Sequence, residues 1–408
     1  MFKIDRAKAL RIVLIGALVN LFLYLGVSTT GVIRLLSMMF LNISGITLLI
    51  FFFKLTKKKF DTNSYFKLMF FLLITWCFIT VIRAMSPNAQ TFITLFGHYL
   101  IGWAWLTSLA VVFGFNMSNW LENFDFFAKV SLIGSILALG SPFYSLDLVF
   151  AIMELLVFLP MLFLTYFYHS IKRQRIIIFT FIAYIIVSIF SGQRANLGLI
   201  LMMVSFTIFE LYRQREIGMY KKISVVFAVL LIMMLLLSQV DNMIQSVEND
   251  EDAQTDTRTF LFVELFADLE PYEFVIGRGA LGTYFSPYFE YTQRHGLGGD
   301  TPNRMVNEVG YLHMLLKGGG IMMGLHLLIF LPIVYLGIFA SKNIITRMCG
   351  YYIFIILMMW MINSYEIYSA KFLMLWMSAG TVISKKNRNL RNRDILVKIN
   401  KRYQFAER

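Results

Sequence analysis

Charged residues are scarce in this chain. Asp, Glu, Lys and Arg make up 15% of its 408 residues, whereas 58% are hydrophobic. Soluble domains are about 25% charged and about 45–50% apolar, so the composition excludes an ordinary soluble globule. Apolar runs of about 20 residues, the length that crosses a bilayer core of about 30 Å, recur from end to end. The sequence therefore predicts an all-α, polytopic integral membrane protein with the architecture of a helical bundle.

Cysteine and the familiar catalytic motifs are also rare or missing. The two cysteines, Cys77 and Cys349, lie inside apolar runs, which predicts buried side chains and no disulfide. None of the five histidines has the H-E-x-x-H spacing, and the chain has no Walker motif, no G-x-G-x-x-G after a strand and no G-x-S-x-G. We therefore expect no metal and no cofactor.

Positive charge is present, but its placement argues against nucleic acid as a partner. The net charge is +13, and Lys and Arg gather in short segments between apolar runs and in the tail SKKNRNLRNR. That is the pattern of cytoplasmic loops and of contact with membrane lipids. It predicts about twelve spans with both termini cytoplasmic, a large extracytoplasmic loop at 241–306 and a basic tail at 385–408. The spans lie near 10–28, 31–53, 65–82, 92–115, 126–140, 146–168, 175–192, 195–212, 222–240, within 307–340, and near 345–363 and 368–383. The chain thus divides into helices one to nine at 1–240, the loop, helices ten to twelve at 307–384, and the tail.

The large loop is acidic overall, yet it carries several arginines and no lysine. Arginine is the residue suited to bidentate contact with phosphate, although ion pairs with neighbouring acids are the simpler role for any one of them. Within the loop, LFVELFADLE has helical spacing and predicts an amphipathic helix at the interface, whereas GRGALGTYFSPYFEY predicts an irregular loop. The arginines are Arg258, Arg278, Arg294 and Arg304.

The end of the loop offers candidates for acid–base chemistry. From Val306 the apolar pattern predicts a helix that enters the membrane, with Asn307 and Tyr311 on one face and Glu308 on the adjacent one. Glu308 could take a proton from a sugar hydroxyl, or it could simply favour the positive end of the helix dipole. His295 and His313 lie on the same side as further candidates. The glycines at 318–320 predict a bend or a close approach of backbones.

One arginine interrupts the apolar run IVSIFSGQRANLGLILMMVSF. Alternation of the spans places Arg194 at an outer turn, where it could anchor the helix by reaching the headgroups. Its position on the same side as the loop arginines suggests that it shares a site with them.

The order of these motifs resembles the O-antigen polymerase and ligase superfamily of bacterial envelope glycosyltransferases (Wzy-type). SGQR at an outer helix end, TDTR opening the loop, VIGRGALGTY, and then NEVGYLHMLLKGGGIMMG carry the resemblance over roughly residues 186–330. The ligases have a histidine–asparagine pair where this chain has Asn307 and Glu308, and this departure favours a polymerase.

The resemblance implies a metal-independent glycosyltransferase of the bacterial inner membrane. Its donor is an oligosaccharide on undecaprenyl pyrophosphate, and its product is a surface polysaccharide such as O-antigen of lipopolysaccharide, or capsule. Arg194 and Arg258 match the family's functional arginines and would clamp the pyrophosphate. Glu308 or His313 would act as the base. The substrate-binding set would contain Arg278, Arg304, His295, Asn307, Tyr311 and Tyr284.

Three alternatives remain open at this point. A ligase would transfer finished glycan to a lipid or protein acceptor. A flippase would carry several charges deep within its spans, whereas here charge is richest at the outer rim. Other lipid-linked glycosyltransferases, such as the shape and division peptidoglycan polymerases, are the third. A chain-length regulator is a further candidate partner, and the sequence leaves it open.

Overall fold

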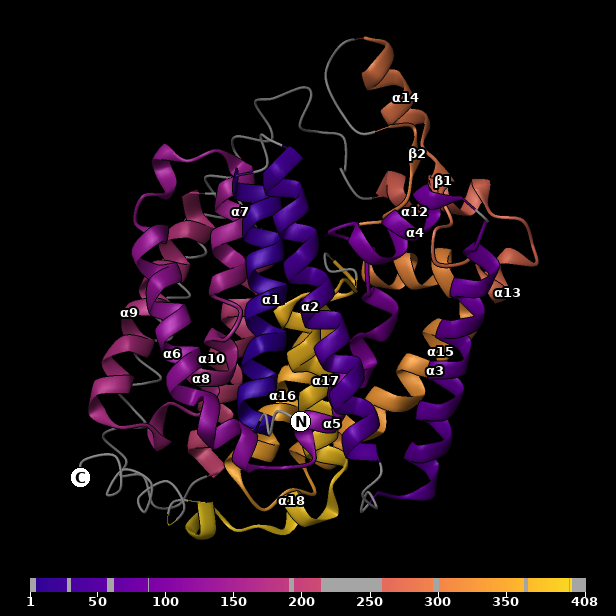
Figure 1. Cartoon of the computed structure of the whole chain (residues 1–408). Coiled ribbons are helices and arrows are strands. Elements are labelled where there is room, and N and C mark those ends of the chain that lie inside the picture. The colour runs from indigo at the N-terminus through magenta and orange to yellow at the C-terminus, as the bar shows by residue number, and fades with distance from the viewer. Residues whose placement is uncertain are drawn as a thin grey trace.

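Helices make up most of the computed structural model, and most of them run side by side as a bundle (Figure 1). A group of short helices and two strands gathers at one end of the bundle, which we call the loop end. The last short helix, α18, lies at the opposite end, which we call the tail end, and α1 begins there too. The structure describes residues 5–27, 31–56, 62–86, 88–190, 194–213, 259–295, 301–362, 366–395 and 397.

The N-terminal half supplies the periphery of the bundle. Its first three helices have 22, 26 and 21 residues, and from α4 onward short helical pieces alternate with the long helices α6, α9 and α10. The elements are α1 (Arg6–Val27), α2 (Gly31–Thr56), α3 (Ser64–Ala84), α4 (Ala89–Gly97), η1 (Ala104–Ala110), α5 (Val111–Gly114), α6 (Ser118–Ala138), η2 (Ser141–Phe143), α7 (Leu146–Leu155), α8 (Leu159–Leu164), η3 (Tyr166–Tyr168), α9 (Ile171–Phe190) and α10 (Arg194–Arg213).

The C-terminal half supplies the loop end and the centre of the bundle. Residues 259–309, as far as they are described, form a unit that we call the loop module. The elements are α12 (Thr259–Asp268), α13 (Glu273–Ile276), β1 (Tyr284–Phe285), α14 (Pro287–Arg294), β2 (Asn303–Arg304), α15 (Gly310–Ile338), α16 (Ile344–Met359), α17 (Ala370–Ile383) and α18 (Lys385–Asn389). β1 and β2 pair antiparallel, with Tyr284 opposite Arg304.

The chain has the helices of a multi-pass membrane protein. Among the described residues, six helices are long and apolar enough to cross a bilayer: Arg6–Leu25, Gly31–Leu55, Ser64–Ala84, Asp147–Leu164, Ala195–Arg213 and Gly310–Ile338. Each of the six overlaps a predicted span. The prediction of an all-α membrane bundle is therefore confirmed, and the predicted span 222–240 lies outside the described residues.

The predicted span at 92–115 is not one helix. α4 ends at Gly97, and the chain then turns through Trp103, whose φ of 62° is left-handed, before η1 and α5 complete the segment. The indole Nε1 of Trp103 donates to Asn42 Oδ1 at 3.0 Å and to Phe96 O at 3.1 Å, and these bonds hold the turn in place. A hydropathy window cannot register such a break, because the residues on both sides of it are equally apolar.

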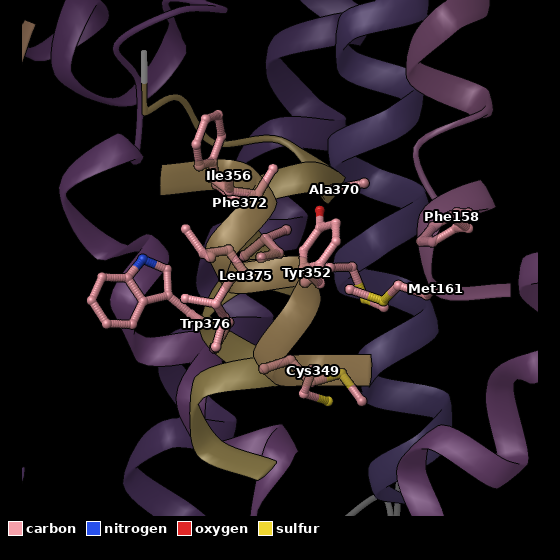
Figure 2. Close-up of a cluster of buried hydrophobic side chains, with 14 of the residues drawn as sticks. Phe158, Met161, Cys349, Tyr352, Ile356, Ala370, Phe372, Leu375 and Trp376 are labelled. Carbon is pink, nitrogen blue, oxygen red and sulfur yellow. The ribbon is translucent and has the colours of Figure 1, made fainter. Parts of the chain in front are cut away.

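The two innermost helices are shorter than the about 20 residues of a typical span. α16 has 16 residues and α17 has 14, so at 1.5 Å per residue they extend about 24 Å and about 21 Å. They are buried on nearly all sides, and Figure 2 shows Tyr352 and Cys349 of α16 beside Phe372, Leu375 and Trp376 of α17. Because other helices surround them, protein and not lipid sets their length.

Glycine allows these inner helices to approach their neighbours closely. A Cβ on Gly337 would lie 2.6 Å from Gly350 Cα, between α15 and α16. A Cβ on Gly114 would lie 1.9 Å from Met377 O, and one on Gly380 would lie 2.0 Å from Val111 O, between α5 and α17. Membrane helices associate through such close packing and not through a hydrophobic driving force, so small residues determine where they cross.

A buried ion pair fixes the tail end. Arg347 Nε on α16 lies 3.0 and 2.9 Å from the two carboxylate oxygens of Glu210 on α10, and Tyr351 donates to the same carboxylate at 3.0 Å. Nearby, Arg213 donates to Ile338 O at 2.6 Å, which places the end of α10 beside the end of α15. A bidentate guanidinium is the geometry that best compensates a buried carboxylate.

Candidate functional site

The loop module folds around a small apolar core of its own. Leu261 and Leu265 of α12 are buried against Leu312 and Leu316 of the first turns of α15, together with Tyr284. The predicted helix is confirmed as α12, and its leucines face this core while Phe262 and Phe266 are exposed; its place at the membrane interface stays a prediction. The loop module therefore packs onto the membrane helix and is not a freely extended connector.

The prediction of irregular structure is wrong for the second part of GRGALGTYFSPYFEY. Residues 287–294 form α14, which has Pro287 at its first position. Ser286 caps the helix by accepting from Phe289 N, and its hydroxyl donates to Glu264 Oε2 at 2.6 Å. Proline is preorganised for the first helical turn, and Ser is a preferred N-cap. The sequence S-P therefore begins a helix that the glycine and aromatic content conceals.

Arg278 is fastened inside the loop module. Its guanidinium pairs with Asp268, donates from Nε to Glu273 Oε2 at 2.9 Å, and donates to Thr283 O at 2.7 Å. Burial alone would raise the pKa of Glu273, but hydrogen bonds from Arg278 and from the N–H of Glu270 hold it below the usual value. These contacts occupy the guanidinium within the protein, so its observed role is to hold α12 and α13 together.

The glycine segment, residues 277–282, is bonded through its backbone to two membrane helices. Arg278 N donates to Leu316 O at 2.7 Å and Gly279 N to Lys317 O at 3.0 Å, while Ala280 N donates to Thr80 O of α3 at 3.0 Å. The carbonyls of Leu316 and Lys317 are available to the loop because the helical geometry of α15 breaks at Gly319. The loop therefore satisfies polar groups that a broken helix would otherwise leave unpaired in the membrane.

The break in α15 is at Gly319, whose φ of 67° and ψ of −169° are not helical. A Cβ there would lie 2.2 Å from Val275 O, and a Cβ on Gly277, where φ is 66°, would lie 2.6 Å from Gly318 N. Trp76 Nε1 of α3 donates to Gly318 O at 2.8 Å and satisfies one more freed carbonyl. The predicted bend at glycines 318–320 is confirmed, and its cause is the crossing of the loop over the helix.

A cleft of about 460 Å³ opens where the glycine segment meets α3. Arg83, at the end of α3, donates to Ile276 O at 2.6 Å and to Gly277 O at 2.8 Å. None of the ion pairs in the described part of the chain involves Arg83. We call this the Arg83 cleft, and its lining consists of Arg83, Ala84, Glu273, Arg278, Leu281, Gly282 and Thr283.

Lys317 of α15 is buried, with 6% of its surface exposed. Its Nζ donates to the carbonyl of Gly282, a residue of the cleft lining, at 2.9 Å. Lys317 lies four residues after the buried His313 on α15, one helical turn further along. No ion pair involving Lys317 occurs among the residues that the structure describes.

Arg304 forms the second group of predicted site residues. It is 7% exposed, stacks over the ring of Phe289 at 4.1 Å, and lies 3.4 Å from the hydroxyl of Tyr284. Its Nη2 is 3.2 Å from Oε1 of Glu308, whose side chain is 44% exposed. Burial raises the pKa of Tyr284 to about 12, so this phenol remains a neutral hydrogen-bonding group. The arrangement leaves one half-exposed carboxylate beside a fixed guanidinium.

Asn307 and Glu308 precede the helix and do not lie on its faces as predicted. α15 begins at Gly310, because Asn307 Oδ1 accepts from Val309 N at 3.0 Å and closes an Asx turn in place of a helical one. Asn307 N donates to Nδ1 of His313 at 3.4 Å, which leaves the ring proton of His313 on Nε2. Asn307 Nδ2 is buried without a hydrogen-bond partner in the described structure. Glu308, whose side chain is 44% exposed, is therefore better placed than the buried His313 to act as a base.

Two other predicted residues lie away from these groups. His295 ends α14, with its Nδ1 2.8 Å from Tyr291 O, and it is exposed. Tyr311 lies on α15, and its hydroxyl donates to Leu357 O at 3.1 Å, which ties the helix to α16. Neither contact brings the side chain to the Arg83 cleft.

The two arginines matched by the resemblance are only partly placed. Arg194 is the first residue of α10, and because α10 ends at the tail end of α15, its first residue points toward the loop end. Figure 1 shows α10 on the other side of α1 and α2 from α3 and the loop module. The side chain of Arg194, and all of Arg258, lie outside the described residues, so their roles stay predictions.

Sequence reasoning named Arg278 but missed two other groups at the glycine segment, Arg83 and Lys317. In the sequence, Arg83 follows an apolar span and indicates only the end of a membrane helix. Lys317 is a single polar residue before a run of glycines. Only the folded loop shows that both meet the glycine segment. Within the described ranges, no cluster of three or more His, Cys, Asp or Glu could hold a metal ion.

Comparison with known proteins finds no matching family model, no matching curated protein and no matching solved structure. The geometry of the loop end and the motifs of the sequence are therefore the basis for assigning a function.

Proposed function

We propose that this chain is a polymerase of surface polysaccharide repeat units in the bacterial inner membrane. It would transfer the growing glycan from undecaprenyl pyrophosphate onto a lipid-linked repeat unit at the outer leaflet. In this proposal the chain has about twelve spans, the termini lie in the cytoplasm, and the loop end faces outward. The proposal keeps the resemblance to the O-antigen polymerase and ligase superfamily as its reason for naming these substrates.

One observation carries the proposal. At a single end of a membrane bundle, a loop module docks onto a broken helix and leaves a cleft lined by Arg83, and the same module carries a half-exposed carboxylate, Glu308. Fixed cations stabilise a leaving pyrophosphate in a partly dry site, and a carboxylate can accept the proton of an attacking hydroxyl. Both needs of a glycosyl transfer from a lipid pyrophosphate are present at that end.

The proposed reaction uses the residues of this chain as follows. The hydroxyl oxygen of the acceptor sugar attacks the anomeric carbon of the donor, and its proton passes to Glu308. The bond between that carbon and the phosphate oxygen breaks, and its electron pair leaves with the pyrophosphate. Arg304 holds Glu308 in position. Arg83 would face the negative charge that develops, and the resemblance implies the same role for Arg194 and Arg258.

The surface glycan of a deletion strain, separated on a gel, tests the proposal. Single repeats attached to the final acceptor are the expected result. Long lipid-linked chains with none transferred would show a ligase, and loss of all outer glycan would show a flippase. An unchanged ladder would reject all three functions.

Arg194→Lys in the complemented strain tests the clamp. We expect short chains, because lysine keeps the charge and loses the bidentate contact. Full-length polymer would show that Arg194 does not clamp the pyrophosphate. The test of the polymerase assignment would then be the glycan of the deletion strain.

A further inference from the structure

The acids of α12 point into the loop module, unlike the acids of a helix on a soluble surface. Glu264 accepts from Ser286 Oγ at 2.6 Å and from Tyr288 N at 3.0 Å. Asp268, at the end of the same helix, pairs with Arg278. A helix that lies in water directs its charged side chains outward, so the orientation of α12 does not suit water.

The opposite face of α12 is entirely apolar. Leu261 and Leu265 cover the core of the module, and every exposed residue between positions 260 and 268 is apolar. The three larger ones are between 38% and 62% exposed. We call this surface the α12 face, and it consists of Phe262, Val263, Phe266 and Ala267.

We propose that the α12 face lies in the lipid of the leaflet at the loop end and anchors the loop module to the bilayer. An interfacial helix buries its apolar face about 5–10 Å into the boundary between headgroups and acyl chains. Phenylalanine is a residue suited to that boundary. The lipid contact goes beyond the proposed function and does not depend on it.

Continuity with a membrane helix identifies lipid as the occupant of this face. The rings of Phe266 and Phe274 lie 5.7 Å apart, and two residues further along the chain Ile276 O accepts from Arg83 at the end of α3. α3 is one of the helices long and apolar enough to span a bilayer, and its residue Ile82 is 65% exposed. The α12 face therefore adjoins the rim of a surface that lipid covers.

The helix α14 provides a contrast within the same module. Figure 1 shows α14 beyond α12, farther from the bundle. Its exposed residues include Tyr291, Gln293 and Arg294, each of which carries a polar group. The module thus presents polar side chains where it projects from the bundle and an apolar face on α12.

Lipid contact at α12 has a consequence for the cleft. Asp268 of α12 pairs with Arg278, which belongs to the lining of the Arg83 cleft. The depth of α12 in the leaflet therefore fixes the depth of the cleft relative to the headgroups.

A spin label on the α12 face tests the proposal. The full-length chain carries Val263→Cys, is labelled with a nitroxide, and is reconstituted in vesicles of phosphatidylethanolamine and phosphatidylglycerol. Power saturation then compares collisions with oxygen, which concentrates in hydrocarbon, and with a nickel chelate, which stays in water. The native Cys77 and Cys349 are buried, and the unmodified chain shows how much label they take up.

Tyr291→Cys on α14 is the matched control, since this position is also exposed. We expect the ratio of oxygen to nickel collisions to be several-fold higher at position 263 than at position 291. Equal ratios would overturn the proposal. Weak collision with both reagents at position 263 would also overturn it, because a second copy of the chain would then cover the face.

If the labelled Val263→Cys chain fails to fold, as judged by its unfolding temperature, Ala267→Cys on the same face replaces it with the same expectation. Hydrogen exchange of the α12 amides in vesicles tests the anchoring itself. Val263→Asp should accelerate this exchange several-fold, because a charge is expelled from the apolar boundary, whereas Tyr291→Asp should leave it unchanged. Unchanged exchange in both variants would overturn the anchoring role.

Discussion

Replacing Arg278 by alanine should undock the glycine segment before it affects any chemistry. Arg278 pairs with Asp268 and Glu273, and the three side chains are 21%, 29% and 12% exposed. Removing one partner of a mostly buried, hydrogen-bonded charge pair costs about 3–5 kcal/mol. This free energy is lost from the docking of residues 277–282, because the guanidinium connects α12 and α13, which immediately precede these residues in the chain.

Hydrogen exchange measures this cost where it arises. The amide N–H groups of Gly279 and Ala280 donate to carbonyls of α15 and α3, and they exchange only when the segment lifts away. A cost of about 3–5 kcal/mol raises the open population by roughly 10²–10³-fold or more, and exchange should accelerate by the same factor. Arg294→Ala is the control, since its ion pair with Glu290 is a surface i,i+4 pair with Arg294 72% exposed. It should change exchange at these amides by less than about twofold.

Two results would refute the reasoning. Unchanged exchange at Gly279 in Arg278→Ala would show that the ion pairs do not hold the segment. Short chains in the complemented strain without faster exchange would return Arg278 to the substrate-binding role that the sequence predicts.

Three further predictions concern Glu273, Glu366 and Gly319. The pKa of Glu273 is lowered in the folded state, so its contribution to stability is fully present above about pH 4.5 and is lost as pH falls through the folded pKa. Amide exchange of the glycine segment should therefore accelerate in acid. Glu273→Gln should abolish that pH dependence. Glu366 accepts from Trp376 Nε1 at 2.7 Å and contacts His326 Nε2 at 3.0 Å. Glu366→Ala should therefore destabilise the bundle by about 3–5 kcal/mol in thermal unfolding. Glu366→Gln should cost clearly less, because the amide oxygen still accepts from Trp376. Gly319→Ala places a Cβ at a φ of 67° and 2.2 Å from a loop carbonyl. We expect a loss of stability of roughly 1–3 kcal/mol or more and faster amide exchange at the loop end. A stable variant with unchanged exchange would contradict the observed crossing of the loop over α15.

The membrane class of the fold could be predicted from the sequence, because composition decides it. Spans such as 31–53 and 65–82 are uniformly apolar over the thickness of a bilayer, and no tertiary contact is needed to recognise them. The break at Trp103 and the shortness of α17 could not be predicted in that way. Both depend on neighbouring helices that supply hydrogen-bond partners and exclude lipid.

The candidate site was predictable only in its residue types. Arginine, a rim carboxylate and glycine at the loop end are visible in the sequence, but their partners are not. The distinction between Arg278, which is fully paired, and Arg83, which is not paired with a carboxylate in the described chain, depends on where Asp268 and Glu273 fold. Lys317 was missed because burial, which gives it significance, is a property of the docked loop.

The attachment of the glycine segment through backbone amides has a consequence for how this protein can change over time. The N–H groups of Gly279 and Ala280 bond to main-chain carbonyls, so substitutions at cleft-lining positions such as Leu281 or Thr283 leave those bonds intact. Mutational drift can therefore alter the shape and polarity of the cleft without loosening the loop. Chains that diverge from this one could therefore keep this anchorage while retaining almost none of the surrounding side chains.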